Sequence, residues 1–312
     1  MRKRGAGFAF CLVFLAFPLL VTAGERVYPI FPLTREPVLD GRIKGDAAWE
    51  KIPFATGFFR FQSQDYAFKQ TSFGIGYLSD KALYVGFICM EPEMEKIKAN
   101  CEDGDINIWT EDSIEIFLFP RGADNYYQFM VNAIGSRWNG KGQGPPYFPT
   151  WNWEARTYRG ADFYSVELKI PFDVLGRIPE LGETWRGNFC RNIYSPQDRA
   201  TRWGRGGFHD PESFAALIFG RKRFEEKMRN LANEIGKSQR EFVKIEGTAF
   251  YREHQEEISH YLKRWKKIEE KMVSPDRLSP LELWEVYEQL VSESGFVDKL
   301  RQELFRQSLF TE

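Results

Sequence analysis

Two neighbouring stretches of the chain alternate apolar and polar residues with a period of two. The sequence SIEIFLF at residues 113–119 places its isoleucines and its leucine on one face of an extended strand. The sequence YYQFMVNA at residues 126–133 alternates in the same way, so Gln128 is expected beside Glu115 on the other face. Between them, RGADN at residues 121–125 carries residues that tight turns favour. The pattern predicts two paired strands with one apolar face and one mixed face.

Further short runs of β-branched and aromatic residues are bounded by glycine, proline, asparagine or aspartate. Such runs are typical of strands, and no segment with helical spacing separates them. This arrangement favours an antiparallel β-sandwich, with immunoglobulin-like or jelly-roll-like layering, over a parallel sheet. The sandwich is expected to occupy residues 24–220. Its additional strands are predicted near residues 38–39, 54–61, 72–77, 83–90, 163–170, 187–194 and 214–219.

The last part of the chain differs in character, because lysine, glutamate, arginine and leucine become frequent there. Apolar residues recur with four-three spacing over residues 224–245 and 258–272, which predicts two amphipathic helices. The sequence SPLE at residues 279–282 has the form of a capping box, so a third helix is expected to run to Leu290. A fourth helix is predicted over residues 296–310.

These helices make up a predicted C-terminal helical region, residues 221–312. Their apolar stripes must be covered, because an exposed stripe of this kind is unfavourable in water. The region either packs on itself or on the sandwich, or it serves self-association or docking to another protein.

The N-terminus is basic and continues into an apolar run from about Phe8 to Val21. The run is shorter than the roughly 20 residues that span a bilayer, and it ends in a small-residue cleavage pattern. We therefore predict a signal peptide over residues 1–23 and a secreted or periplasmic protein. No later segment is apolar enough to suggest a membrane span in the mature chain.

The net charge argues against a nucleic-acid partner. The formal charge of -1 becomes -4 when the three positive charges of Arg2, Lys3 and Arg4 leave with the signal peptide. A mildly acidic chain lacks the basic surface that phosphate backbones require.

Three cysteines follow the signal peptide: Cys89, Cys101 and Cys190. Export permits disulfides, and Cys89 and Cys101 are the pair nearest in sequence. Three buried thiols that pack as small apolar groups are the other interpretation.

Polar and aromatic side chains gather on the mixed face of the two paired strands. Trp109 stands just before the first strand, and Glu115, Gln128 and Asn132 occupy polar positions. An aromatic wall beside a polar floor suits a sugar, which has hydroxyls and a flat apolar face. A carboxylate within a strand is costly to bury alone, so Glu115 is expected to bond a ligand or to meet an arginine such as Arg191.

Several short motifs occur in order between residues 36 and 220. They are VLDG at 38–41 with AW at 48–49, ALYVGF at 82–87, WTEDSIE at 109–115, YQF at 127–129, VE at 166–167 with IPF at 170–172, WRGNF at 185–189 and FA at 214–215. This set resembles carbohydrate-binding module family 9, one of a wider group of sandwiches that includes DOMON domains. The resemblance implies a non-catalytic module that binds the reducing ends of glucans or xylans. It also implies a role in carbohydrate catabolism beside glycoside hydrolases.

The same resemblance implies the residues of a binding slot between two tryptophans. Trp109 and Glu115 match the family's first tryptophan and the glutamate six residues after it, and the second tryptophan falls on Trp203. The sequence departs from the family in having Ala200 in place of an asparagine and Gln128 in place of an arginine. A sugar stacked between the two indole rings is the expected complex.

Members of the family also hold structural calcium. Asp103, Asp105 and Asp112 are the candidate ligands in this chain, since calcium prefers oxygen ligands. Acidic loop residues that are only solvated are the alternative.

Three other functions stay open from the sequence. Glu115 and Glu167 are the best candidates for a pair of carboxylates that cleaves a glycosidic bond, but no catalytic motif accompanies them. Some DOMON-like sandwiches carry haem, yet haem favours an axial pair and His209 is the one histidine of the sandwich. A sandwich that has a structural role or binds a partner protein is the third.

Overall fold

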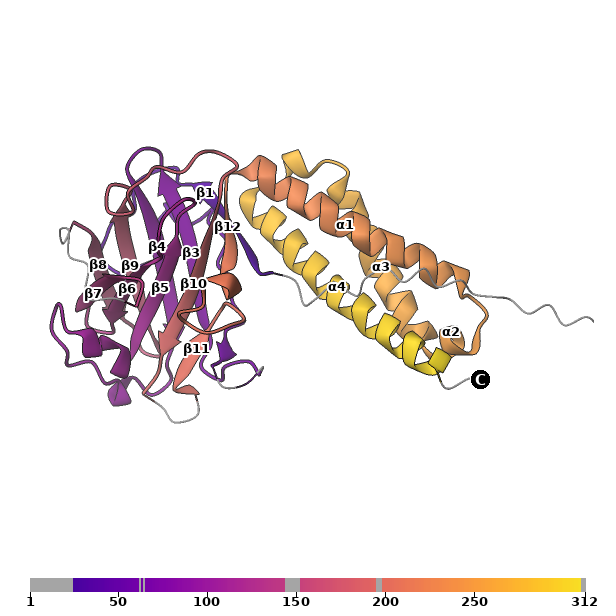
Figure 1. Ribbon diagram of the computed structural model, residues 1–312, viewed down its shortest axis with the longest axis horizontal. Helices are drawn as coiled ribbons and strands as arrows, with labels where there is room; N and C mark the ends of the chain where they lie inside the picture. Colours follow the sequence, from indigo (N-terminus) through magenta and orange to yellow (C-terminus); the bar gives the residue numbers. More distant parts are fainter. Residues whose placement is uncertain (1–24, 62, 64, 144–151, 195–197, 310–312) are drawn as a thin grey trace, which may run out of the picture.

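The computed structural model describes residues 25–61, 63, 65–143, 152–194 and 198–309, so the predicted signal peptide at residues 1–23 lies outside the described residues. Two β-sheets face each other, and a bundle of helices extends from one side of them (Figure 1). Among the described residues, no helix is both long and apolar enough to cross a membrane.

The first sheet has the strand order β7-β6-β5-β10-β12-β1. A short strand, β11, pairs with β10, and another, β2, pairs with β11. The bounds of these strands are β1 Val27–Pro32, β2 Phe59–Arg60, β5 Ser113–Phe119, β6 Tyr127–Asn132, β7 Arg137–Lys141, β10 Thr184–Asn192, β11 Ala200–Arg202 and β12 Ala215–Phe219.

The second sheet has the strand order β1-β3-β4-β9-β8. Its strands are β3 Thr71–Leu78, β4 Ala82–Met90, β8 Glu154–Arg159 and β9 Phe163–Pro171. Most predicted strands agree with the structure to within about three residues. The run at 54–61 is an exception, because only β2 and one bridge from Ala55 to Phe73 are strand-like there. Strands β1, β7, β8 and β11 were not predicted.

Strand β1 joins the two sheets and pairs in parallel with both neighbours. Its first residues lie beside β12, and Phe31 and Pro32 lie beside β3. The predicted β-sandwich is confirmed, and β1 adds two parallel pairs that the alternation did not indicate. The strand is buried over nearly its whole length, so its sequence is a continuous apolar run without alternation. Residues 38–39, which were predicted as a strand, are not one.

The inner faces of the two sheets make the main core. Ile114, Ile116 and Phe129 from the first sheet are buried there. The rings of Phe73 on β3 and Phe189 on β10 stack across the sandwich with centroids 4.0 Å apart. Because side chains alternate along each strand, the residues between these point to the outer face of the first sheet.

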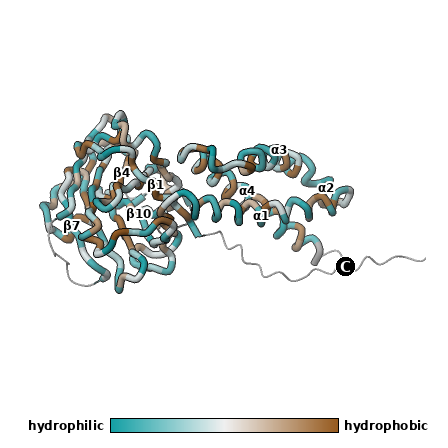
Figure 2. The backbone as a smooth tube through the Cα atoms, turned by 90° about the horizontal axis from the view of Figure 1, so that it is seen from above, coloured by the Kyte–Doolittle hydropathy of each residue, from teal (hydrophilic) through white to brown (hydrophobic). Residues whose placement is uncertain are grey.

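Short helical turns interrupt the sandwich at η1 (Met94–Lys96), η2 (Ile106–Thr110) and η4 (Pro211–Ser213). The helical region follows β12 after Gly220, whose φ of 87° turns the chain sharply. Seen from above, the helices lie alongside one another as an elongated bundle beside the sandwich (Figure 2). They are α1 Arg221–Lys244, α2 Ala249–Glu253, α3 Gln255–Met272 and α4 Pro280–Leu309, with a short turn, η5, at Pro275–Arg277.

The capping box predicted before α4 is present. The Ser279 amide donates to the Glu282 carboxylate at 2.7 Å, and the Glu282 amide donates to the Ser279 hydroxyl at 3.3 Å. The prediction of two helices in this stretch was wrong, because α4 runs through Gly295 without a break. Glu293, in the middle of the expected gap, bonds Arg264 of α3 at 2.5 and 3.0 Å and so ties α4 to its neighbour.

The helical bundle packs on the sandwich through aromatic rings. Phe224 of α1 meets Phe31 of β1, with centroids 6.5 Å apart, and Trp284 of α4 meets Tyr28 of β1 at 5.4 Å. All four side chains belong to one continuous buried cluster. The bundle therefore packs both on itself and on the sandwich, while self-association through it stays a prediction.

We predict that Phe224→Ala lowers the free energy of unfolding of the whole chain by about 3 to 5 kcal/mol, the usual cost of removing a fully buried phenylalanine. Urea denaturation followed by circular dichroism measures the change. Val243→Ala, at a position 55% exposed on the same helix, is the matched control and should have little effect. A loss below about 1 kcal/mol for Phe224→Ala would contradict the packing described above.

Candidate functional site

An open cleft of about 1500 Å³ lies over the outer face of the first sheet. Its floor comes from β5, β6 and β10, and η2 lies to one side, packed on β5, β6 and β7. Aromatic, charged and amide side chains share the lining. Those used below are Phe61, Lys69, Glu91, Glu93, Lys96, Lys98, Trp109, Glu111, Asp112, Glu115, Gln128, Met130, Asn192, Ile193, Tyr194, Arg199, Phe208 and His209.

The floor of the cleft is a buried carboxylate held by two amides. Gln128 donates to one oxygen of Glu115 and Asn192 donates to the other, both at 2.7 Å. The predicted neighbourhood of Glu115 and Gln128 is thus present, while Asn192 was missed. Arg191, which was considered as a partner, follows Cys190 in the strand and points to the other side. Burial is the main cause that raises the pKa of Glu115, and the two amides oppose it.

Trp109 forms one wall of the cleft and is 53% exposed. It lies on η2, whose first turn is capped by Asp105, since that carboxylate accepts the amide of Asn107 at 2.8 Å. Beneath η2, Ile108 packs with Met130 of β6 in a small apolar cluster. The helix turn is therefore anchored on one side, and the indole of Trp109 is left facing solvent.

Glu111 holds the segment that carries Trp109 against the sheet. Its carboxylate accepts the amides of Asn100 at 2.7 Å and Cys101 at 3.1 Å, and the side-chain amide of Asn132 at 3.1 Å. These hydrogen bonds lower the pKa of Glu111 against the opposing effect of burial. Asn132 was predicted to bond a ligand, but it is fully buried and fixes this segment instead.

Trp203 does not form the second wall that was predicted for it. The ring is 3% exposed and lies in the main core, with centroids 5.0 Å from Phe73. Its indole N–H donates to the carbonyl of Thr56 at 3.0 Å, so its polar group is already satisfied. The slot between Trp109 and Trp203 is therefore absent from this structure.

Aromatic side chains other than Trp203 line the cleft. Tyr194, which follows β10, is 59% exposed, and Phe61, next to β2, is 43% exposed. Phe61 meets Phe208 edge to face at 5.0 Å, and the guanidinium of Arg202 lies 5.1 Å from its ring centroid. The sequence did not indicate Phe61 and Tyr194 as cleft residues because both lie at the ends of strands, where alternation no longer predicts the direction of a side chain.

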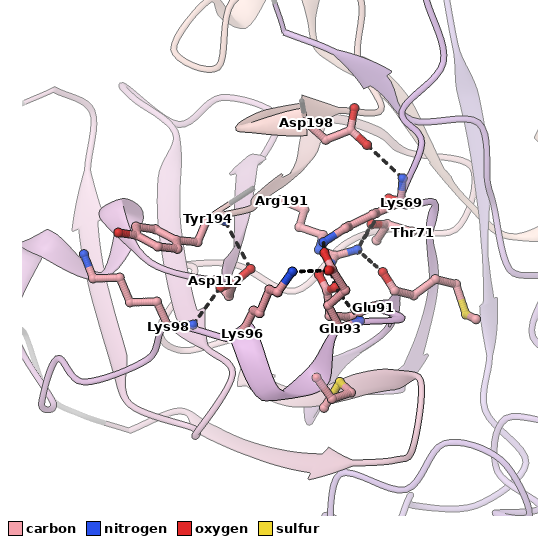
Figure 3. A network of polar contacts seen from close by, with 12 residues as sticks. Lys69, Thr71, Glu91, Glu93, Lys96, Lys98, Asp112, Arg191, Tyr194 and Asp198 are labelled. Carbon is pink, nitrogen blue, oxygen red and sulfur yellow. Dashed lines mark hydrogen bonds and ion pairs between the residues drawn. The ribbon is translucent and has the colours of Figure 1, made fainter. Parts of the chain in front are cut away.

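A network of charged side chains borders the cleft (Figure 3). Glu91 is buried and pairs with Lys69 at 2.7 Å and with Arg191 at 3.4 Å. Arg191 also donates to the carbonyl of Met90 at 2.9 Å. The network ties the start of β3 and the end of β4 to β10, so it joins the two sheets beside the cleft.

The three candidate calcium ligands bond the protein's own backbone. Asp103 accepts the amide of Arg137 at 2.8 Å, Asp105 caps η2, and Asp112 accepts the amides of Lys98 and Tyr194 at 2.9 and 3.2 Å. In the described part of the chain, no group of three histidine, cysteine, aspartate or glutamate side chains could hold a metal ion. The residues do not fit a shared calcium site, and calcium stays an untested prediction.

The other candidate residues lie as follows. Glu167 is on β9 in the second sheet, where it accepts the indole N–H of Trp49 at 2.7 Å, so it shares no site with Glu115 on β5. His209 lines the cleft, and its Nδ1 lies 2.7 Å from the Tyr126 hydroxyl. Burial lowers the pKa of His209.

The three cysteines after the predicted signal peptide are free thiols in this structure. Cys89 and Cys190 are buried, and Cys101 is partly buried near η2. The interpretation as unpaired thiols therefore holds here, and the bridge between Cys89 and Cys101 is absent.

Comparison with known proteins places the fold. No protein-family model and no curated protein matches the sequence. Among solved structures, a protein from Bacteroides uniformis ATCC 8492 that is proposed to bind carbohydrate has 15% identity and a TM-score of 0.51 over 63% of this chain and 100% of its own. This similarity shows a shared fold.

Two further neighbours are structures of a carbohydrate-binding module of family 9 from Caldicellulosiruptor kristjanssonii. The complex with cellotriose has 18% identity and a TM-score of 0.47 over 63% of this chain and 95% of its own. The complex with glucose has 19% identity and a TM-score of 0.46 over 62% of this chain and 97% of its own. Family 9 structures are thus among the structural neighbours of this chain.

We predict that the free energy of unfolding of the native chain falls, relative to that of Glu115→Gln, as the pH rises from about 4 to about 7. The folded state keeps the proton of Glu115 at pH values above the ordinary glutamate pKa of about 4.3, whereas the unfolded state releases it. The folded state therefore loses stability relative to the unfolded state as the pH rises through the raised pKa. Glutamine carries no such proton. Urea denaturation of both proteins at each pH measures the difference, and an advantage of the native chain that grows with pH would contradict the raised pKa.

Proposed function

We propose that this protein binds carbohydrate without catalysis, in the cleft on the outer face of the first sheet. The observation that carries the proposal is the half-exposed indole of Trp109 beside the polar floor of Glu115, Gln128 and Asn192. A pyranose has an apolar face that can stack on an aromatic ring and hydroxyls that can bond carboxylate and amide groups.

The ligand class that we propose is a glucan or xylan oligosaccharide. Amide and carboxylate groups that are already positioned by each other lose little freedom when a sugar binds, which favours affinity. Small polar ligands gain little free energy per atom after desolvation, so we expect dissociation constants from roughly micromolar to millimolar.

We also propose that the protein works after export, in the breakdown of polysaccharide. The basis is the predicted signal peptide at residues 1–23, together with the resemblance of the sequence motifs to family 9. Under this proposal the helical bundle either acts as a spacer or joins the sandwich to a partner protein.

Isothermal titration calorimetry with cellotriose and xylotriose tests the function. We predict that Trp109→Ala weakens binding at least about tenfold, since it removes the exposed stacking surface. Phe68→Ala, at a position that is 73% exposed and does not line the cleft, is the matched control and should bind as the native chain does.

The same titration with oligosaccharides reduced to the alditol tests whether the chain end is recognised. Loss of heat with the reduced sugars would support recognition of a reducing end. Equal heats from all sugars in Trp109→Ala and in the native chain would show that the cleft is not the site.

A further inference from the structure

The carboxylates of the cleft are already occupied by partners within the protein. Glu93 pairs with Lys96 and, at 3.8 Å, with Lys69, which also holds Glu91. Together with Arg191, which also pairs with Glu91, these residues form a cluster of three cationic and two acidic side chains. A ligand that approaches it therefore meets carboxylate groups whose oxygens are turned toward protein donors.

The remaining acids of the cleft bond amides. Glu111 accepts two backbone amides and one side-chain amide, Asp112 accepts two backbone amides, and Glu115 accepts two side-chain amides. Burial raises the pKa of both Asp112 and Glu115, which favours their neutral forms. The oxygens of all three carboxylates therefore already accept hydrogen bonds from donors within the protein.

Two further cations line the cleft. Within the described part of the chain, neither Lys98 nor Arg199 makes a salt bridge, although both line the cleft. The Lys98 ammonium lies 4.9 Å from the centroid of the Tyr194 ring, a cation–π contact that positions it without neutralising it. Arg199 is exposed.

Backbone contacts bring the segments that carry the two cations to the same end of β10. The Asp112 carboxylate accepts the amides of Lys98 and Tyr194, as Figure 3 shows, and so ties their segments together. The amide of Ile193, the residue before Tyr194, donates to the carbonyl of Arg199 at 3.1 Å. An ammonium and a guanidinium thus come from segments that flank one exposed aromatic ring.

We infer that the cleft selects a saccharide that carries a carboxylate, such as a uronic acid unit, with Lys98 and Arg199 as the groups that recognise the charge. The inference rests on the proposed carbohydrate binding and narrows the ligand: an acidic saccharide is expected to bind more tightly than a neutral glucan or xylan oligosaccharide. A guanidinium fork and an ammonium are the side chains that bond carboxylates most strongly, and the Tyr194 ring between their segments can support the sugar. A neutral sugar would offer these two cations no opposite charge.

Calorimetry on the full chain tests the inference with a matched pair of ligands, trigalacturonate and its fully methyl-esterified form. These two have the same rings and differ in charge. We expect the acid to bind at least about tenfold more tightly, and its affinity to fall when NaCl is raised from about 0.05 to about 0.5 M, whereas that of the ester should not change.

Lys98→Met and Arg199→Gln should each weaken binding of the acid about five- to tenfold and leave binding of the ester within about twofold. Lys44→Met is the matched control, because its ammonium lies 5.3 Å from the Phe163 ring in a similar contact outside the cleft. It should change neither affinity.

Equal affinities for acid and ester, or equal losses for both ligands in the two variants, would overturn the charge selection and leave carbohydrate binding intact. Absence of heat from the acid, the ester, cellotriose and xylotriose alike would overturn the proposed function itself. The two failures are therefore distinguishable in one set of titrations.

Discussion

The register of β5 against β6 is the constraint on which the candidate site depends. Ile114 and Ile116 must face the second sheet, because their burial is a large part of what holds the two sheets together. Side chains alternate, so Glu115 is then forced onto the outer face, where Gln128 reaches it. A slip of one residue would move this carboxylate into the core and the isoleucines into solvent. The polar floor is thus a consequence of the same packing that stabilises the fold.

The position of Trp109, which forms a wall of the cleft, depends on a buried network of hydrogen bonds around Glu111. Glu111 gathers two backbone amides and Asn132, and so presses the η2 segment against β6. Leaving such a buried carboxylate without its donors would cost several kcal/mol, as would leaving the donors unpaired. Residues that read as ligand contacts in the sequence can therefore have a purely internal task, and Asn132 is an example. The exposed indole of Trp109 is what this internal network presents to solvent.

Sequence patterns predicted the parts of this structure that local geometry decides. Alternation located β5 and β6 and the pairing of Glu115 with Gln128, and capping chemistry located the start of α4. Tertiary context decided the rest. The sequence around Trp203, with Arg202 and Arg205 nearby, is the same whether the ring faces solvent or the core, and only packing against Phe73 settles which. The parallel pairing of β1 and the continuity of α4 likewise depend on contacts with distant segments.

We propose that Trp109 borders a sugar-binding cleft, whereas Trp203 belongs to the core. The indole N–H signals of the tryptophans, followed by nuclear magnetic resonance during titration with cellotriose or trigalacturonate, test it directly. Assignment of each signal by substitution with phenylalanine identifies the two rings. The account predicts that the Trp109 signal shifts with saturation and that the Trp203 signal stays in place. Saturable movement of the Trp203 signal with none at Trp109, or no movement of any indole signal, would contradict it.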